Sequence, residues 1–417
     1  MSVPRILLLA GSSPYDQTVG DIFLRELCSH YPRESLYRLV FVSRLPEPPP
    51  KDWIGFPVRY FQLPRQNGIL QRLGRPFTHV TDFLHHWYDR NLRATVVASK
   101  VLRMVQEQRV DLVWVFPAGA TLTYVTRKVI CVLKTPFVVT VWDPPDYFAA
   151  HLRLNRINLR ILQKDFANIL LKAVRCGVAS EGMKEEYENL YGTKCIIQIH
   201  GVDPRLRQAP AKGISKDGQI VIGHAGNWHG QQEWEALLSA LTSVNWSIDG
   251  REVTVRVLGS HILVKTQGRT RIEYLGWRSQ EETIKLLSDM DIMYLPYWFD
   301  KRFGVSVRLC FPNKLTAYLA AGRPVLFHGP EDSSPARFFR RFPAGVCCHS
   351  LEKSAIIECL HRLVNDRELY ASAVQAGQRA LDEELNQQVF LRRFAELIGI
   401  QEKDLPVSYK KMIEECD

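Results

Sequence analysis

The chain has 417 residues, enough for two domains of about 200 residues each, and its 46% hydrophobic and 24% charged content is typical of a soluble globular protein. No apolar run approaches the roughly 18 residues needed to cross a bilayer, and Met1 to Ala10 is too short and too strand-like for a signal peptide. We therefore expect a cytoplasmic protein. Nine cysteines without a C-x-x-C spacing argue against a zinc site and a disulfide framework.

The net charge of +10 is concentrated near the start of the chain. Residues 1–140 hold 18 Lys and Arg against 10 Asp and Glu. Such a basic region favours an anionic lipid surface, a phosphorylated acceptor or nucleic acid as partner, with a solvated basic surface as the alternative. Nucleic acid is the least favoured partner, because no recognised nucleic-acid-binding motif accompanies the charge.

The chain opens with the pattern of a βαβ unit. A buried strand over Arg5 to Ala10 stops at Gly11, an amphipathic helix follows from Val19 to His30, and Leu39 to Val42 forms the next strand. Gly11 lies just past a strand's carboxyl end, where doubly wound sheets bind ligands. There is no G-x-G-x-x-G motif, so little supports NAD or FAD as a cofactor.

Between Pro46 and Pro76 the chain is rich in proline, arginine and aromatic residues, and we expect surface loops around a strand near Val58 to Leu63. One hypothesis is an interfacial membrane contact here. The alternative is a helix packed on its own domain. The residues concerned are Ile69, Leu70, Leu73 and Phe77, flanked by Arg65, Arg72 and Arg75.

Alternating helices and strands then continue at the interval of βαβ units. We expect helices over 95–108, 121–134, 162–175 and 181–191 and strands over 112–116, 137–141, 177–179 and 196–199. Asp143 follows the strand that ends at Val141, in the sequence V-W-D-P-P-D-Y. Its carboxylate is a candidate to take a proton from an acceptor hydroxyl or to stabilise positive charge on a sugar. The alternative is a helix cap or turn-former before Pro144.

The second half repeats the pattern after a linker-like stretch at 203–218. We expect strands over 220–223, 253–258 and 292–296 and helices over 233–241, 279–288, 350–364, 367–381 and 384–398. Asp289 and Asp291 form a D-x-D, but they fall in a helix-to-strand turn, so we expect no metal site there.

The most informative stretch runs from Phe311 to Gly329, F-P-N-K-L-T-A-Y-L-A-A-G-R-P-V-L-F-H-G. Pro312 fits a first helical position, Gly322 fits a left-handed helix end, and Pro324 prevents the helix from resuming. The helix start beside Lys314 is suited to bind an anion such as a diphosphate.

This stretch resembles the nucleotide-binding helix of the retaining glycosyltransferases of GT-B fold, whose pattern is close to F-P-S-K-L-x-E-Y-x-A-A-G-x-P-V. The matching residues are Phe311, Pro312, Lys314, Leu315, Tyr318, Ala320, Ala321, Gly322, Pro324 and Val325. The family's glutamate, which usually binds the nucleotide ribose, falls at Ala317, and Thr316 is the nearest polar substitute.

Three further elements carry the resemblance. V-W-D-P-P-D-Y is similar to the family's H-D-x-W-P, with Asp143 retained and Trp142 at the histidine position, and H-G-V-D-P at 200–204 is similar to N-G-V-D-x-x-x-F. The loop His224 to Gly230 resembles the glycine loop that approaches the donor's phosphates. The arginine and lysine of many relatives are absent from it. The donor-binding residues implied are Gly11, Gly226, Asn227, His229, Arg308, Asn313, Lys314 and Thr316, with Lys314, Arg308 or charged His229 neutralising the diphosphate.

The resemblance implies an α/β protein of GT-B fold, with two Rossmann-like doubly wound domains facing a cleft. An acceptor-side domain over 1–203 would be joined by a linker at 204–218 to a nucleotide-sugar domain over 219–384, and 385–417 would form a C-terminal helix that crosses back, followed by a tail.

The implied activity is transfer of a sugar from a nucleotide-sugar donor to a glycan, lipid-linked or small-molecule acceptor, with retention and without metal or cofactor. Peripheral contact at the inner membrane face is an added expectation. The main alternative is a GT-B-shaped protein that binds a nucleotide or glycan without transferring it, and Ala317 favours this alternative. Hydrolysis or epimerisation of a nucleotide sugar is a smaller alternative.

Overall fold

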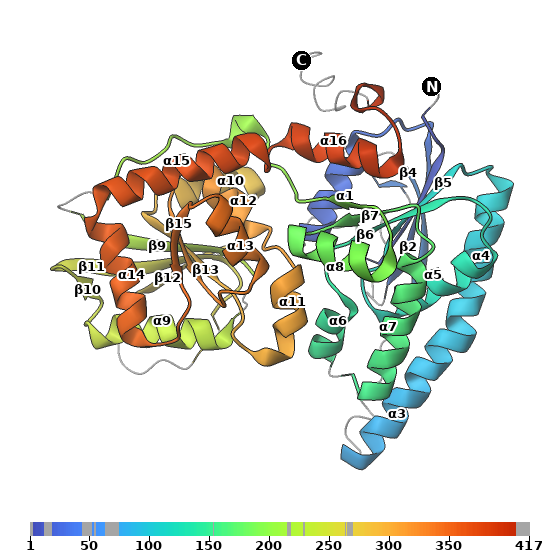
Figure 1. The fold of residues 1–417 in the computed structure, drawn as a ribbon, viewed down its shortest axis with the longest axis horizontal. Coiled ribbons are helices and arrows are strands. Elements are labelled where there is room, and N and C mark those ends of the chain that lie inside the picture. The colour runs from blue at the N-terminus through green and yellow to red at the C-terminus, as the bar shows by residue number, and fades with distance from the viewer. Residues whose placement is uncertain are drawn as a thin grey trace. The chain divides into compact units, whose positions relative to one another are not determined.

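The computed structural model describes residues 3–11, 19–43, 52–53, 56–62, 75–152, 154–214, 218–227, 230–262, 264 and 270–405. The chain divides into two compact units, unit 1 with Met1–Gln198 and Leu391–Asp417, and unit 2 with Ile199–Phe390 (Figure 1). Each unit holds a mainly parallel sheet with helical crossovers, so the doubly wound α/β class predicted from the sequence is confirmed.

Within the described residues, unit 1 contains an eight-stranded sheet in the order β3-β4-β2-β1-β5-β6-β7-β8. Its strands are β1 (Ile6–Ala10), β2 (Leu36–Ser43), β3 (Asp52–Trp53), β4 (Phe56–Gln62), β5 (Leu112–Phe116), β6 (Phe137–Val141), β7 (Arg175–Val178) and β8 (Cys195–Ile197). The central strands β1, β5 and β6 are buried along their whole length, which explains why they are apolar apart from Thr140, whose hydroxyl accepts a hydrogen bond from Trp114 Nε1 at 2.9 Å.

The helices of unit 1 include one long, continuous helical run that the sequence pattern did not reveal in full. They are α1 (Val19–Ser29), α3 (Arg75–Tyr88), the π-helical η1 (Asp89–Arg93), α4 (Ala94–Glu107), α5 (Ala120–Val132), α6 (Pro145–Leu152), α7 (Arg156–Leu170) and α8 (Glu181–Tyr191). Only the part near α4 was predicted, because Asp89 and His86 on the buried side of this run are polar. Of the residues in the predicted membrane contact, those from Arg65 to Leu73 lie outside the described residues, while Arg75 and Phe77 belong to the first turn of α3.

Helix α7 begins earlier than predicted, at Arg156 instead of Leu162. The side chain of Asn155 accepts a hydrogen bond from the Asn158 backbone N–H at 2.8 Å and so caps the helix start.

Within the described residues, unit 2 contains a seven-stranded sheet in the order β10-β11-β9-β13-β14-β15, with β12 beside β11. Its strands are β9 (Ile220–Gly226), β10 (Ser247–Ile248), β11 (Arg251–Gly259), β12 (Ile272–Gly276), β13 (Ile292–Pro296), β14 (Val325–His328) and β15 (Gly345–Cys348). Alternate strand residues such as Ile220 and Ile222 pack with Trp234 of α9 and Leu360 of α14 in one core cluster. These two helices therefore cover one face of the sheet.

The helices of unit 2 include several short pieces near the strand ends. They are η2 (Pro204–Leu206), α9 (Gln231–Ser243), α10 (Gln280–Ser288), η3 (Lys301–Phe303), α11 (Gly304–Leu309), α12 (Lys314–Ala320), α13 (Ser334–Arg341), α14 (Lys353–Asn365) and α15 (Arg367–Glu383). The capped helix predicted after Ser279 is confirmed, since Ser279 and Glu282 form a reciprocal capping box at the start of α10. The sequence pattern did not predict α13 or β15.

Helix α16 (Gln387–Ile398) begins in unit 2 and ends in unit 1, and η4 (Glu402–Asp404) follows it. In unit 1 its Phe394 ring packs against those of Trp114, at 4.9 Å between centroids, and Tyr31, at 6.4 Å. The carbonyl of Leu397 accepts a hydrogen bond from Arg175 at 2.6 Å. Among the described helices, none has the length and apolar character that spanning a membrane requires.

The stretch around α12 is organised differently from the prediction at one end. The helix has seven residues and begins at Lys314, so Pro312 is not its first residue. The carbonyl of Pro312 instead accepts a hydrogen bond from Leu315 N at 2.9 Å, in the turn that precedes the helix. At the other end Gly322 is left-handed, with φ of 69°, as predicted.

Candidate functional site

Two glycines bring the ends of neighbouring strands together in unit 2. Gly226 at the end of β9 is paired with Gly259 at the end of β11, and both have positive φ, 98° and 101°. A Cβ on Gly259 would lie 2.6 Å from the Gly226 carbonyl oxygen. A side chain at either position would therefore strain the backbone, so the strand ends present bare backbone at the carboxyl edge of the sheet.

Lys314 at the start of α12 reaches this edge. Its Cε lies 3.6 Å from where a Gly226 Cβ would be, and its Nζ donates to the Asn227 carbonyl at 3.2 Å. The structure thus brings together Gly226, Asn227 and Lys314, three of the predicted donor-binding residues. Burial lowers the pKa of Lys314 from its ordinary value to about 7.

His224 orients this lysine, and the sequence analysis did not assign it a role. Its ring is buried, with Nδ1 3.1 Å from the Tyr294 carbonyl and Nε2 3.4 Å from Lys314 Nζ. A neutral ring that donates from Nδ1 to the carbonyl leaves the Nε2 lone pair to accept from the ammonium. The available signal was a histidine at a buried position of an otherwise apolar strand.

Glu233 is a second buried polar residue near the loop, and it too was not singled out from the sequence. It lies in the first turn of α9, is 1% exposed, and its Oε1 accepts from Phe299 N at 2.6 Å. Burial raises its pKa. A Cβ on Gly230, with φ of 75°, would lie 2.7 Å from Glu233 Oε2, so this carboxylate packs under the end of the loop.

The remaining predicted donor residues are placed less favourably or are not described. Asn313 precedes α12 and is half-buried, and Arg308 is exposed on α11, where it donates to the Gly304 carbonyl at 3.2 Å. Thr316 is 2% exposed and its hydroxyl donates to the His200 carbonyl at 3.3 Å, so a ribose would have to displace that bond. His229 lies outside the described residues.

Asp143 and Gly11 belong to unit 1. Asp143 is half-buried in the turn between β6 and α6. Gly11 follows β1 at the same edge of the sheet, since β5 pairs with both β1 and β6. A Cβ on Gly11 would lie 2.7 Å from the Ala118 carbonyl oxygen, so close packing alone accounts for this glycine.

Trp142 holds the turn that carries Asp143. Its ring lies edge-on to Phe23 of α1 at 4.2 Å and to Phe116 of β5 at 5.1 Å between centroids. The roles of Asp143 and Gly11 stay predictions.

Among the described residues, no cluster of His, Cys, Asp and Glu has the arrangement of a metal site. Asp291 of the D-x-D accepts from Val221 N at 2.8 Å and so joins the turn to β9.

Neither a model of a known protein family nor a curated protein sequence matches the chain. Solved structures do match it over nearly its whole length. Sucrose-phosphate synthase from Thermosynechococcus elongatus has 12% sequence identity and a TM-score of 0.64, covering 99% of this chain and 100% of that one. A trehalose-phosphate synthase (UDP-forming) from Burkholderia xenovorans, in complex with glucose-6-phosphate, has 9% identity and a TM-score of 0.60, covering 95% and 100%.

A glycosyltransferase from Rickettsia africae also matches, with 13% identity and a TM-score of 0.58, covering 94% of this chain and 98% of that one. Identities this low establish a shared fold and leave the activity to be argued from the site. The chain therefore has the GT-B fold, as the likeness of its motifs to the GT-B glycosyltransferases predicted.

Proposed function

We propose that the protein is a glycosyltransferase that moves a sugar from a nucleotide-sugar donor to a glycan, lipid-linked or small-molecule acceptor, with retention of configuration and without a metal. The observation that carries this proposal is the contact of Lys314 with Gly226 and Asn227. An ammonium beside exposed strand-end backbone is suited to bind the diphosphate of a donor. The matching synthase from Burkholderia xenovorans is UDP-forming, so UDP-sugars are the first donors to test.

The transfer breaks the bond between the anomeric carbon and the diphosphate oxygen and forms one from that carbon to the acceptor oxygen on the same face. Lys314 stabilises the negative charge that develops on the leaving diphosphate. Asp143 takes the proton of the acceptor hydroxyl or stabilises the positive charge on the sugar.

The second candidate is a protein that binds a nucleotide sugar without transferring it. Ala317 stands where the resemblance expects a ribose-binding glutamate, and the hydroxyl of Thr316 is committed to the His200 carbonyl. Both observations favour weaker ribose recognition. Donor binding is common to the two candidates, and only turnover separates them.

A thermal-shift screen against UDP-, GDP-, ADP- and dTDP-sugars tests donor binding directly. A donor at 100 times its dissociation constant stabilises the protein by about 2.7 kcal/mol, and we expect such a shift with one nucleotide class. The shift should be the same with a chelator present, because no metal takes part in the proposal. If none of the four classes shifts the melting temperature, the proposed function is wrong.

Donor binding should depend on pH through Lys314. Its pKa is about 7 in the free protein, and a bound diphosphate raises it, so binding takes up a proton. The affinity should therefore fall as the pH rises from 7 to about 9, where the free lysine is neutral. Calorimetry at pH 7 in two buffers with different ionisation enthalpies should report an uptake of about half a proton. No proton uptake would contradict the placement of Lys314 at the diphosphate.

The lowered pKa of Lys314 also makes the free energy of unfolding depend on pH. Between pH 7 and its ordinary pKa, the lysine holds its proton in the unfolded chain but not in the folded one. The contribution of this group to the free energy of unfolding therefore rises with pH across that window.

A further inference from the structure

A line of large apolar side chains faces outward along the helical run α3–η1–α4. Their exposed fractions range from 37% to 58%. Exposed apolar residues are ordinary when scattered singly, but a contiguous set indicates a surface that contacts something else. We call this set the α3 stripe: Val80, Phe83, Leu84, Trp87, Tyr88, Leu92 and Val96.

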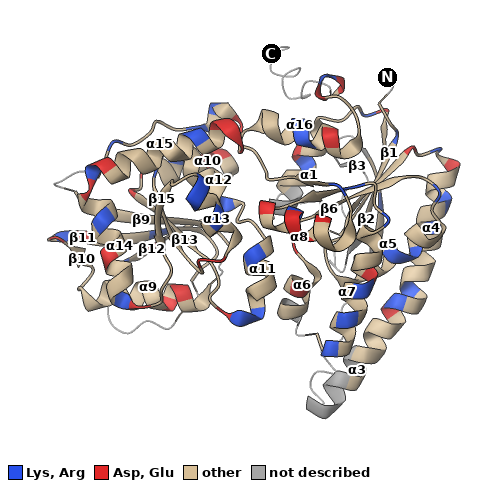
Figure 2. Ribbon diagram, in the orientation of Figure 1, with Lys and Arg blue, Asp and Glu red and all other residues tan. Residues whose placement is uncertain are grey.

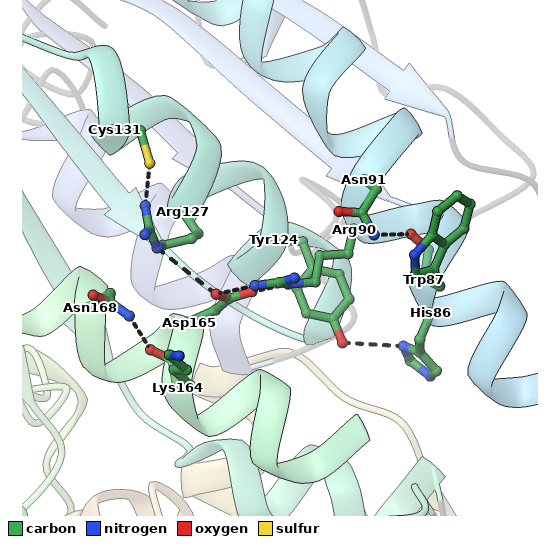
Figure 3. Close-up of polar contacts among 10 residues, drawn as sticks. All are labelled: His86, Trp87, Arg90, Asn91, Tyr124, Arg127, Cys131, Lys164, Asp165 and Asn168. Atoms are coloured by element: carbon green, nitrogen blue, oxygen red, sulfur yellow. Dashed lines mark hydrogen bonds and ion pairs between the residues drawn. The ribbon is translucent and has the colours of Figure 1, made fainter. Parts of the chain in front are cut away.

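The other side of the run is buried and charged, and Figure 3 shows Arg90 turned toward Asp165 of α7 and away from Trp87 of the stripe. Asp89 is fully buried and accepts from Arg93 at 2.7 Å. Arg90 donates to both oxygens of the buried Asp165 of α7, at 2.6 and 2.9 Å. Rotating the run to bury the stripe would pull Arg90 away from Asp165 and so deprive this buried carboxylate of its closest cation, which is strongly unfavourable.

The neighbouring helix α7, which contacts α3, is basic on its exposed side. Arg156, Arg160 and Lys164 recur at intervals of four and are all exposed, so they form one line, here named the α7 line (Figure 2). Asp165 is the acidic residue of this helix, and it is buried and paired with Arg90. The exposed Ile157 lies on the same helix, at 60% exposure.

We propose that the α3 stripe and the α7 line together dock unit 1 on a bilayer that contains anionic lipids. Exposed Trp87, Tyr88 and Phe83 are the residue types that settle at the boundary between headgroups and acyl chains, and the basic side chains of the adjacent helix α7 are suited to bind anionic headgroups. A second copy of the chain fits less well, because a two-fold contact through the stripe would bring two basic α7 lines together. The inference rests on the proposed function in one respect: the bilayer would present a lipid-linked acceptor.

Sedimentation of the full chain with vesicles tests the proposal without any donor. We expect binding to phosphatidylcholine vesicles that contain phosphatidylglycerol, weakening with added salt, and little binding to phosphatidylcholine alone. The double variant Leu84→Ser, Trp87→Ser and the triple variant Arg156→Gln, Arg160→Gln, Lys164→Gln should each weaken binding by about tenfold or more.

Matched controls separate these surfaces from general effects of polarity and charge. Leu190→Ser replaces an apolar residue of α8 that is 61% exposed, and Lys285→Gln, Lys353→Gln, Arg362→Gln removes three exposed positive charges from unit 2. Both controls should bind vesicles like the parent protein. Unchanged melting temperatures and donor-induced shifts would show that each variant is folded and that the donor site is intact.

Three outcomes would overturn the proposal. They are equal binding to neutral and anionic vesicles or to neither, full binding by the stripe variant, and a parent dimer in light scattering that the stripe variant converts to monomer. The last would assign the stripe to a second copy of the chain. If the protein does not bind vesicles but still shows a donor-induced shift, the membrane proposal is wrong and the proposed function stands. If it binds vesicles but shows no donor-induced shift, the proposed function is wrong and the membrane proposal stands.

Discussion

Replacing Asp143 with Asn is expected to lower the rate of sugar transfer about a thousandfold, because a positioned carboxylate that takes a proton or stabilises charge contributes roughly two to four orders of magnitude. The amide keeps the size of the side chain and the turn between β6 and α6. Donor affinity should therefore be unchanged in a thermal-shift titration, while turnover with a saturating donor is lost.

Asp146→Asn is the matched control for this variant. Asp146 lies in the first turn of α6, and its carboxylate accepts from Gln163 Nε2 at 3.0 Å. It should retain most of the activity. A fully active Asp143→Asn protein would remove Asp143 from the mechanism and leave it as a turn-former.

Replacing Lys314 with Met is expected to weaken donor binding about a hundredfold, since a charge-assisted hydrogen bond to a diphosphate contributes roughly 1.5–3 kcal/mol. Methionine keeps most of the stem that packs along Gly226, so the loss reports the charge. The melting temperature at neutral pH should stay the same or rise, because the folded protein no longer has to accommodate a partly desolvated ammonium. Titration calorimetry with the donor from the thermal-shift screen measures the affinity.

The control is Lys285→Met, which removes an exposed lysine from α10 in the same unit. It should leave donor affinity unchanged. The proton uptake on binding should also disappear in Lys314→Met and persist in Lys285→Met. If Lys314→Met binds the donor as tightly as the parent protein, the role assigned to this lysine is wrong.

Local signals were sufficient for much of the fold. Strands β5 and β6 match the predicted ranges residue for residue, because a short apolar run bounded by turn residues has few alternatives in a parallel sheet. Ser279 could be predicted to start a helix because its side chain caps backbone N–H groups, and Gly322 to end one because glycine adopts the left-handed conformation easily. Pro312 was placed two residues wrongly, since proline is compatible with both the first helical residue and the preceding turn.

The placement of the site was predictable only in part. A glycine at the end of β9 and a lysine at the start of α12 could be selected from motifs, but the contact between Lys314 and His224 joins residues 90 positions apart. That contact depends on the sheet order, in which β13 pairs with β9 and β14 with β13. Thr316 looked available from its sequence position, yet the tertiary structure turns its hydroxyl to the His200 carbonyl.

The amino-acid sequence by itself determined the alternation of helices and strands, their caps and the glycines at the strand ends, because these follow from interactions among residues within a few positions of each other. The tertiary structure alone decided which side of the α3–η1–α4 run is buried. Asp89 and Asp165 pair there with arginines of the run, while the apolar residues of the α3 stripe are left at the surface. The pair of Arg90 with Asp165 joins residues 75 positions apart, and no local periodicity encodes where two such distant groups meet.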